Sequence, residues 1–157
     1  MMTHVEMAIL DAWNVGRQFN LDDCLYGIPH WLGEPPDRPV SYYFFLAGIA
    51  SSQRCRRALE IGTHMGGSVS SIRKGMGEAL ETLVTIDPTD LSDPILARYP
   101  EITKIQGLSS DPAIISRVLA AFGWKPIDLL YIDADHSYES TIQQPPYPVR
   151  AGRAPLI

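Results

Sequence analysis

Four short apolar runs alternate with segments of helical character between residues 57 and 144, and this alternation constrains the fold more than any other feature. Each run has the length of a strand and ends at an aspartate or a glycine. Strands that alternate with helices predict βαβ units, in which neighbouring strands run parallel. We therefore expect an α/β fold with a parallel sheet of four strands and helices on both faces. The runs, in chain order, are RALEIG, TLVTID, ITKIQG and IDLLYID.

The segments after the runs carry helix signals. The best is DPAIISRVLAAFG, in which Asp111 can cap the helix, Pro112 suits its first position and Gly123 can end it. GSVSSIRKGM is a second expected helix, and in DPILARYP we expect Asp93 to cap a short third one. HSYESTIQQ begins another helix after the last run.

The regions on either side differ in character. Residues 3–14 and 41–52 are expected helices, the first with Val5, Ile9 and Ala12 at helical spacing and the second with Ser41 as its N-cap. A proline-rich loop separates them, and four prolines after residue 144 exclude a helix or an interior strand there. The predicted organisation is an N-terminal helical segment at 1–54, an α/β region at 55–144 and a Pro-rich tail at 145–157.

Composition excludes several classes of protein. The 157 residues are 45% hydrophobic and 20% charged, which indicates a globular domain. A net charge of −5 argues against nucleic acid as the main partner. No apolar run approaches the roughly 20 residues of a membrane span, and the N-terminus lacks the basic start of a signal peptide. Cys24 and Cys55 have no metal-binding spacing, so we expect reduced thiols in a cytoplasmic protein.

Polar residues gather where the expected strands end. Ligands bind an open parallel sheet outside the carboxyl ends of its strands, so these residues are expected to share one site. Carboxylates at those ends would repel phosphate but suit hydroxyls, amines, a cation or a metal. The ends in question are Glu60 to Gly62, Asp87, Gly107 to Asp111, and Asp133 to His136.

The glycine-rich corner at residues 62–67 admits two interpretations. Gly62 permits a tight turn, and Gly66 or Gly67 allows a ligand close to the backbone at a helix start. The spacing GxxxGG differs from the dinucleotide pattern GxGxxG, and no GK[ST] follows as in a P-loop. The corner is either a binding turn or a purely structural one.

The acids at the other strand ends are open to similar alternatives. Asp87 sits where an acid commonly takes both hydroxyls of a ribose, yet it could also be a helix cap or a solvated end. Asp133 is the candidate functional acid of DADH, and Asp135 either caps the next helix or contacts a ligand. His136 is a base, a ligand or a solvated loop histidine.

Taken together, LEIGTHMGGS, TIDP and DLLYIDADHSYE resemble the motifs of class I S-adenosylmethionine-dependent methyltransferases. Within that class they look like the small-molecule O-methyltransferase branch, which includes methyltransferase family 24 and the cephalosporin-hydroxylase-like proteins. The resemblance covers about residues 57–142. It implies a Rossmann-like sheet behind an N-terminal helical cap, with S-adenosyl-L-methionine as cofactor.

The resemblance also implies roles for individual residues. Glu60 and the backbone at Gly62 would hold the methionine amine, and Asp87 the ribose hydroxyls. Asp133 matches the first metal ligand of metal-dependent members, where Mg²⁺ would acidify a substrate hydroxyl. We expect Asp133 and His136 to be the catalytic residues. The carboxylate end would be lined by Thr63, Gly66 and Ser68, and the adenine region by Ser109, Ser110 and Asp111.

This chain departs from the family pattern after its fourth strand. Family sheets have seven strands in the order 3-2-1-4-5-7-6, and the fifth supplies further metal ligands, so the metal site here is expected to be incomplete. We expect a C-terminally truncated member whose fourth strand has an open edge. That edge would be covered by the tail, by another chain through self-association, or by aggregation.

The sequence thus leaves several functions open. The first is methylation of a small-molecule hydroxyl, with or without a divalent metal. The second is a vestigial domain that binds the cofactor without turnover. A nicotinamide-dependent oxidoreductase and a pure interaction module fit less well. No feature identifies the acceptor molecule, and neither nucleic acid nor a membrane is expected as a partner.

Overall fold

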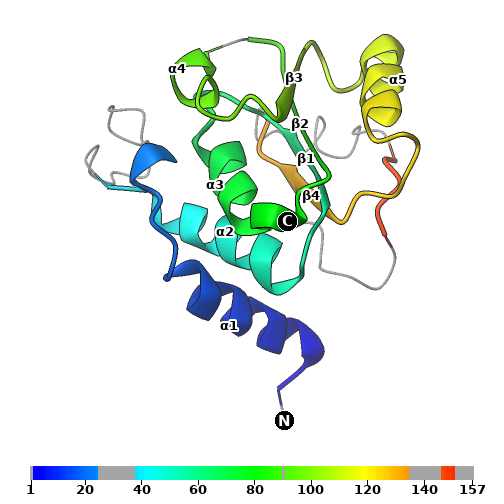
Figure 1. Ribbon diagram of the computed structural model, residues 1–157. Coiled ribbons are helices and arrows are strands. Elements are labelled where there is room, and N and C mark those ends of the chain that lie inside the picture. Colours follow the sequence, from blue (N-terminus) through cyan, green and yellow to red (C-terminus); the bar gives the residue numbers. More distant parts are fainter. Residues whose placement is uncertain (1, 25–37, 90, 135–145, 151–157) are drawn as a thin grey trace.

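The computed structural model of the chain describes residues 2–24, 38–89, 91–134 and 146–150. Its centre is a parallel four-stranded sheet in the order β3-β2-β1-β4 (Figure 1). This confirms the predicted α/β, Rossmann-like fold and its four strands. The strands are β1 (Arg57–Ile61), β2 (Thr82–Asp87), β3 (Ile102–Gln106) and β4 (Leu129–Ile132).

Helices cover both faces of this sheet, as predicted. On one face α3 packs beneath α2, and α1 lies on the outer side of α2; α5 covers the opposite face (Figure 1). None of the helices in the described ranges combines the length and apolar character needed to cross a bilayer. The helices are α1 (His4–Gly16), α2 (Ser41–Ser52), α3 (Gly67–Met76), α4 (Asp93–Leu96) and α5 (Pro112–Ala121), with short 3₁₀ turns at Asp22–Cys24 and Gly77–Ala79.

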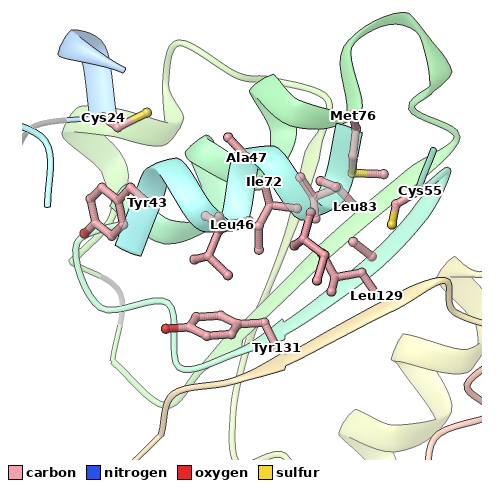
Figure 2. Close-up of a cluster of buried hydrophobic side chains, with 14 of the residues drawn as sticks. Cys24, Tyr43, Leu46, Ala47, Cys55, Ile72, Met76, Leu83, Leu129 and Tyr131 are labelled. Carbon is pink, nitrogen blue, oxygen red and sulfur yellow. The ribbon is translucent and has the colours of Figure 1, made fainter. Parts of the chain in front are cut away.

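Alternation along the strands divides the core between the two faces. In β1, Ala58 joins the cluster under α2 and α3, whereas Leu59 and Ile61 point to the cluster under α5. Figure 2 shows the first cluster, in which Leu46 of α2 and Ile72 of α3 meet side chains from the sheet. Burying one such side chain contributes about 1.5–3 kcal/mol. The N-terminal helices therefore share a core with the sheet.

Local signals explain where α1 and α5 begin. Thr3 and Glu6 form a reciprocal capping box at the start of α1. Asp111 caps α5 by accepting from the backbone N–H of Ala113, and Gly123 has the left-handed φ of +57° expected just beyond its end. Both features of α5 are confirmed.

Two predicted caps are wrong by one residue. Ser41 is the first residue of α2, and the cap position is held by Val40, which offers no side-chain hydrogen bond. Asp93 is likewise the first residue of α4, and the carbonyl of Ser92 accepts the N–H groups of Ile95 and Leu96. Residue preference cannot separate neighbouring cap positions where tertiary packing positions the helix.

The orientation of α1 also differs from the amphipathic expectation. Ala12 is fully buried, but Val5 and Ile9 are 50% and 39% exposed. The reason is that α1 meets α2 through its smallest residues. A Cβ added to Gly16 would lie 1.9 Å from the carbonyl oxygen of Phe44, and one added to Gly48 would lie 1.8 Å from that of Ala12.

A glycine–backbone contact of the same kind joins α2 to α3. A Cβ on Gly75 would lie 2.0 Å from the carbonyl oxygen of Ala47. Backbone therefore rests on backbone at both faces of α2, and no side chain separates the helices at these crossings.

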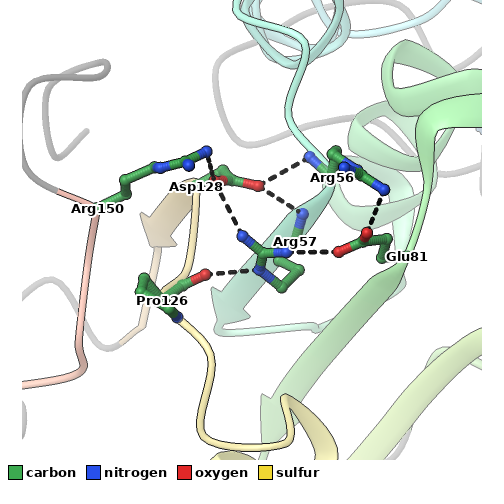
Figure 3. A network of polar contacts seen from close by, with 6 residues as sticks. All are labelled: Arg56, Arg57, Glu81, Pro126, Asp128 and Arg150. Carbon is green, nitrogen blue, oxygen red and sulfur yellow. Dashed lines mark hydrogen bonds and ion pairs between the residues drawn. The ribbon is translucent and has the colours of Figure 1, made fainter.

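Charged residues bind the amino-terminal ends of the strands to one another. Asp128 is almost completely buried, and its Oδ2 accepts the backbone N–H groups of Arg56 and Arg57 at 3.0 and 3.1 Å (Figure 3). The Arg57 side chain donates to the carbonyl oxygen of Pro126 and pairs with Glu81. This network lies at the opposite end of the sheet from the predicted ligand site.

The described part of the tail lies along the outer edge of β4. Val149 forms an isolated parallel bridge with Ile127, and Arg150 pairs with Asp128 at 3.5 Å (Figure 3). Tyr147 is buried in the cluster under α5. The tail thus covers the start of the edge that was expected to be open, while self-association through this edge stays a prediction.

We predict that Gly48→Ala destabilises the protein by about 3 kcal/mol, because the new methyl group overlaps the backbone of α1. Helix propensity alone would give the opposite sign, a gain of about 1 kcal/mol. Urea unfolding measures the difference.

Gly123→Ala is the control. Its φ is +57°, and among the described residues no atom beyond its two chain neighbours lies within 4 Å of an added Cβ, so only backbone strain of about 1 kcal/mol is expected. A neutral or stabilising Gly48→Ala would contradict the proposed backbone contact.

Candidate functional site

The turn after β1 is pressed against the ends of both neighbouring strands. The N–H of Gly62 donates to the carbonyl of Ile86, and the N–H of Asp133 donates to that of Ile61, each at 2.8 Å. Gly62 has a φ of +103°, and a Cβ there would lie 2.0 Å from the carbonyl oxygen of Asp133. Only glycine fits at this position, so the turn itself requires Gly62. A ligand contact at Gly62 stays a prediction.

The next two glycines set the start of α3. Gly66 is the N-cap, with a φ of +85°, and its N–H donates to the carbonyl of Thr63. A Cβ on Gly67 would lie 2.3 Å from the hydroxyl of Tyr43. The start of α3 is therefore held between the turn and α2.

Glu60 is completely buried beneath this turn. Its Oε1 accepts from the Ser68 hydroxyl at 2.5 Å and its Oε2 from the Thr85 hydroxyl at 2.6 Å. Burial raises the pKa of Glu60 to about 8; the two hydroxyls act against this, and the charges of Asp133 and Asp87 add to it. Without exposed area, Glu60 does not itself present a surface to a ligand in this arrangement.

Asp87 ends β2 and organises the loops beside it. Its Oδ2 accepts the backbone N–H of His64 and its Oδ1 that of Thr89, both at 2.8 Å. His64 has a φ of +45°, a conformation that few residues other than glycine adopt. The carboxylate thus helps hold the turn after β1, and it keeps lone pairs for further donors.

A small open pocket adjoins Asp87. It lies beside the ends of β2 and β3 and is polar apart from one isoleucine. Its lining consists of Thr63, Thr85, Asp87, Thr89, Ser92, Lys104, Ile105 and Gln106.

Asp133 follows β4 and lies half-buried next to the same turn. The hydroxyl of Tyr131 donates to its Oδ2 at 2.9 Å. Burial raises the pKa of Tyr131, and the charge of Asp133 acts in the same direction. Tyr131 is therefore the proton donor of this pair.

The segment that follows Asp133 includes His136, which is predicted to act with it in catalysis. His136 and Asp135, with the helix expected after them, lie outside the described residues. Among the residues that the structure describes, no group of three or more His, Cys, Asp or Glu side chains is placed to hold a metal ion.

The predicted adenine region continues from the end of β3. The N–H of Gly107 donates to the carbonyl of Asp87, which brings this loop beside β2. The carbonyl of Ser109 accepts from the Tyr147 hydroxyl at 3.3 Å, and Asp111 is exposed while it caps α5. Cofactor contacts by Ser109 and Asp111 stay predictions.

Comparison with known proteins identifies the domain. The family described as "Methyltransferase domain" matches residues 59–145, more than half of the chain. This chain belongs to that methyltransferase family. Its match spans the turn after β1, Asp87 and Asp133, and none of the curated proteins compared with the chain matches it.

Solved structures share the fold of this methyltransferase domain at low sequence identity. The SAH-bound methyltransferase PaMTH1 of Podospora anserina has a TM-score of 0.55 and 18% identity, over 87% of this chain and 54% of its own. Cofactor-bound Rv0187 from MTB has a TM-score of 0.52 and 23% identity, over 85% and 55%. The O-methyltransferase from Bacillus cereus in complex with SAH has a TM-score of 0.50 and 19% identity, over 88% and 61%. The chain thus spans between 54% and 61% of these three solved chains.

Sequence reasoning missed two residues of the candidate site. Thr85 lies in the middle of an apolar run, and Tyr131 lies in another. Both stand directly beside Glu60 in the register of the sheet. Polar residues inside apolar strands were the available signal, because a buried acid requires such partners.

We predict that the free energy of unfolding contains a pH-dependent contribution from Glu60. The pKa of Glu60 is 4.5 in the unfolded chain and about 8 in the folded protein. Between these two pH values the folded state keeps a proton that the unfolded state releases. The contribution is complete below pH 4.5 and is lost as the pH rises towards 8, at up to about 1.4 kcal/mol per pH unit.

Glu60→Gln removes this titration and preserves the shape of the side chain. The stability difference between wild type and Glu60→Gln should therefore shift against wild type as the pH rises from 5 to 8, in urea unfolding at about five pH values. Glu78→Gln, on the exposed turn after α3, is the matched loss of a carboxylate. Parallel curves for wild type and Glu60→Gln would contradict the prediction.

Proposed function

We propose that this chain binds S-adenosylmethionine at the carboxyl ends of β1, β2 and β4, and that it transfers the methyl group to a hydroxyl of a small molecule in the cytoplasm. The observation that carries the proposal is the position of Asp87, a carboxylate that ends β2 directly against the glycine turn. Two free, buried cysteines suit a reducing compartment.

The chemistry of the site fits this cofactor. S-adenosylmethionine carries an ammonium, a sulfonium and ribose hydroxyls but no phosphate. The carboxylates of Asp87 and Asp133 near the turn favour cations and hydroxyl donors and would repel phosphate. Of the three similar solved structures, two are SAH-bound and one is cofactor-bound, which supports the same choice.

Individual residues would act as follows. Asp87 would accept the ribose hydroxyls with the lone pairs that its two backbone bonds leave. The turn from Gly62 to Gly66, with Thr63 and Ser68, would receive the amino-acid end. Glu60 would support that end from beneath, since it is buried. Ser109 and Asp111 would border the adenine.

When bound, the cofactor supplies an activated methyl group. The chain then has to align an acceptor oxygen with it and take up the acceptor's proton. Asp133 is the acid we assign to the proton, because it is half-buried at the edge of the site and Tyr131 fixes its orientation. His136 would assist as predicted from its place after β4. We assign no step to a metal.

Calorimetric titration with S-adenosylhomocysteine, with and without Mg²⁺, tests the binding step. A radiolabelled methyl donor with a panel of small phenols and sugars tests transfer. Binding together with methyl transfer supports the proposal. Binding without transfer favours a domain that holds the cofactor without turnover, and the absence of binding overturns the proposal.

We predict that Asp87→Asn weakens S-adenosylhomocysteine binding at least tenfold, about 1.4 kcal/mol. One of the two oxygens becomes an amide NH₂, which can accept neither a ribose hydroxyl nor a backbone N–H. Calorimetry measures the affinity, and thermal unfolding checks that the variant is folded.

Asp11→Asn on α1 is the matched control, because it removes the same charge from an exposed position outside the proposed site. Equal affinity in Asp87→Asn and wild type would contradict the ribose role.

A further inference from the structure

A row of hydroxyl groups links the buried carboxyl of Glu60 to the turn after β1. Thr85 Oγ1 lies 2.6 Å from Glu60 Oε2, and Thr63 Oγ1 lies 2.5 Å from Thr85 Oγ1. Either threonine can be the donor of the second bond. Both threonines also line the small open pocket, and Thr63 itself belongs to the turn. The row therefore runs from a buried acid to the wall of an open pocket.

The hydrogen bonds along this row can be donated in either direction. With Glu60 ionised, Thr85 donates to Oε2 and Thr63 can donate to Thr85. With Glu60 protonated, Oε2 donates to Thr85, Thr85 donates to Thr63, and Thr63 donates outward. Ser68 donates to Oε1 in both states. A hydroxyl offers one donor and two acceptor sites, so no bond is lost when the direction reverses.

The groups around Glu60 favour its neutral form while no ligand is bound. Asp87 faces it from β2, and Tyr131 and Asp133 face it from β4. From the helical side, Ser68 of α3 contacts it, and the Tyr43 hydroxyl of α2 packs at Gly67. The charges that act on Glu60 are both carboxylates, and the Glu60 side chain has no exposed area, so an ionised Glu60 would be poorly compensated.

We infer that Glu60 holds a proton in the ligand-free protein and releases it through Thr85 and Thr63 when the cationic amino-acid end of the cofactor binds at the turn. The inference rests on the proposed function. One O–H bond of Glu60 is broken, its proton passes to solvent, and the ligand keeps its ammonium group. The net change is one proton released and one new pair of opposite charges.

The open pocket connects Thr63 with solvent and is the route by which the proton leaves. Lys104 is part of the pocket wall, which makes the pocket itself a poor place for a second cation. The ligand's cation is therefore placed at the turn, and the pocket carries the exchange between Thr63 and solvent. Glu60 in this scheme is a positioning residue, because it acts on the ligand through its charge and through its neighbours.

Calorimetry in two buffers of different ionisation heat, at pH 7, counts the protons released on binding. S-adenosylhomocysteine should release up to one proton from wild type and none from Glu60→Gln. Adenosine, which lacks the amino-acid end, should release none from either protein. The affinity of wild type for S-adenosylhomocysteine should rise by up to about tenfold per pH unit between about pH 6 and 7.5, and that of Glu60→Gln should stay flat.

A second pair of variants tests the row of hydroxyls. Thr85→Val removes a donor that stabilises the ionised carboxyl, so the affinity for S-adenosylhomocysteine at pH 7 should fall while that for adenosine is retained. Thr85→Ser restores the hydroxyl and should restore the affinity.

The outcomes separate the two proposals. Equal proton release from wild type and Glu60→Gln overturns the proton linkage while leaving the proposed function standing. If wild type does not bind S-adenosylhomocysteine, the proposed function fails. Infrared spectroscopy at pH 7 then still tests the ligand-free state, in which wild type should show a protonated carboxyl band that Glu60→Gln lacks; its absence would overturn the inference.

Discussion

The close approach of Gly62 to the carbonyl of Asp133 holds the candidate site together. This contact, with the two hydrogen bonds beside it, brings the ends of β1, β2 and β4 to one place. Asp87 then reaches the turn, and Glu60 is enclosed beneath it. A side chain at position 62 would move the turn away from β4 and separate the carboxylates on which the proposed chemistry depends.

The two ends of the sheet have different tasks. At the amino-terminal end, Asp128 accepts two backbone N–H groups through Oδ2, and the guanidinium groups of Arg57 and Arg150 lie 3.5 Å from its Oδ1. These contacts join β1, β4 and the tail. At the carboxyl end, Glu60, Asp87 and Asp133 accept from hydroxyl and backbone N–H groups, and Lys104 lines the pocket beside Asp87. The contacts at the amino-terminal end stabilise the sheet. The carboxylates at the other end can then serve to attract a cationic ligand.

The sequence predicted the strands and most helices well because buried parallel strands are continuous apolar runs. The glycine turn and Asp87 were found for the same reason, since both directly follow such runs. The position of α1 was less predictable, because its contact with α2 depends on Gly16 and Gly48 and not on an apolar stripe. The roles of Thr85 and Tyr131 were not predicted. Both depend on the register between strands, which cannot be read from a local sequence pattern.

The glycine contacts that α2 makes with α1 and α3 restrict how this chain can change in evolution. At residues 16, 48 and 75, the size of one side chain sets the distance between two helices. A larger residue at one crossing can be accepted only if a neighbouring helix shifts, and α2 lies between both neighbours. Among relatives, we therefore expect the residues at these three positions to change together or to stay small together. The distances between the helices would then be visible as correlated substitutions in the sequence.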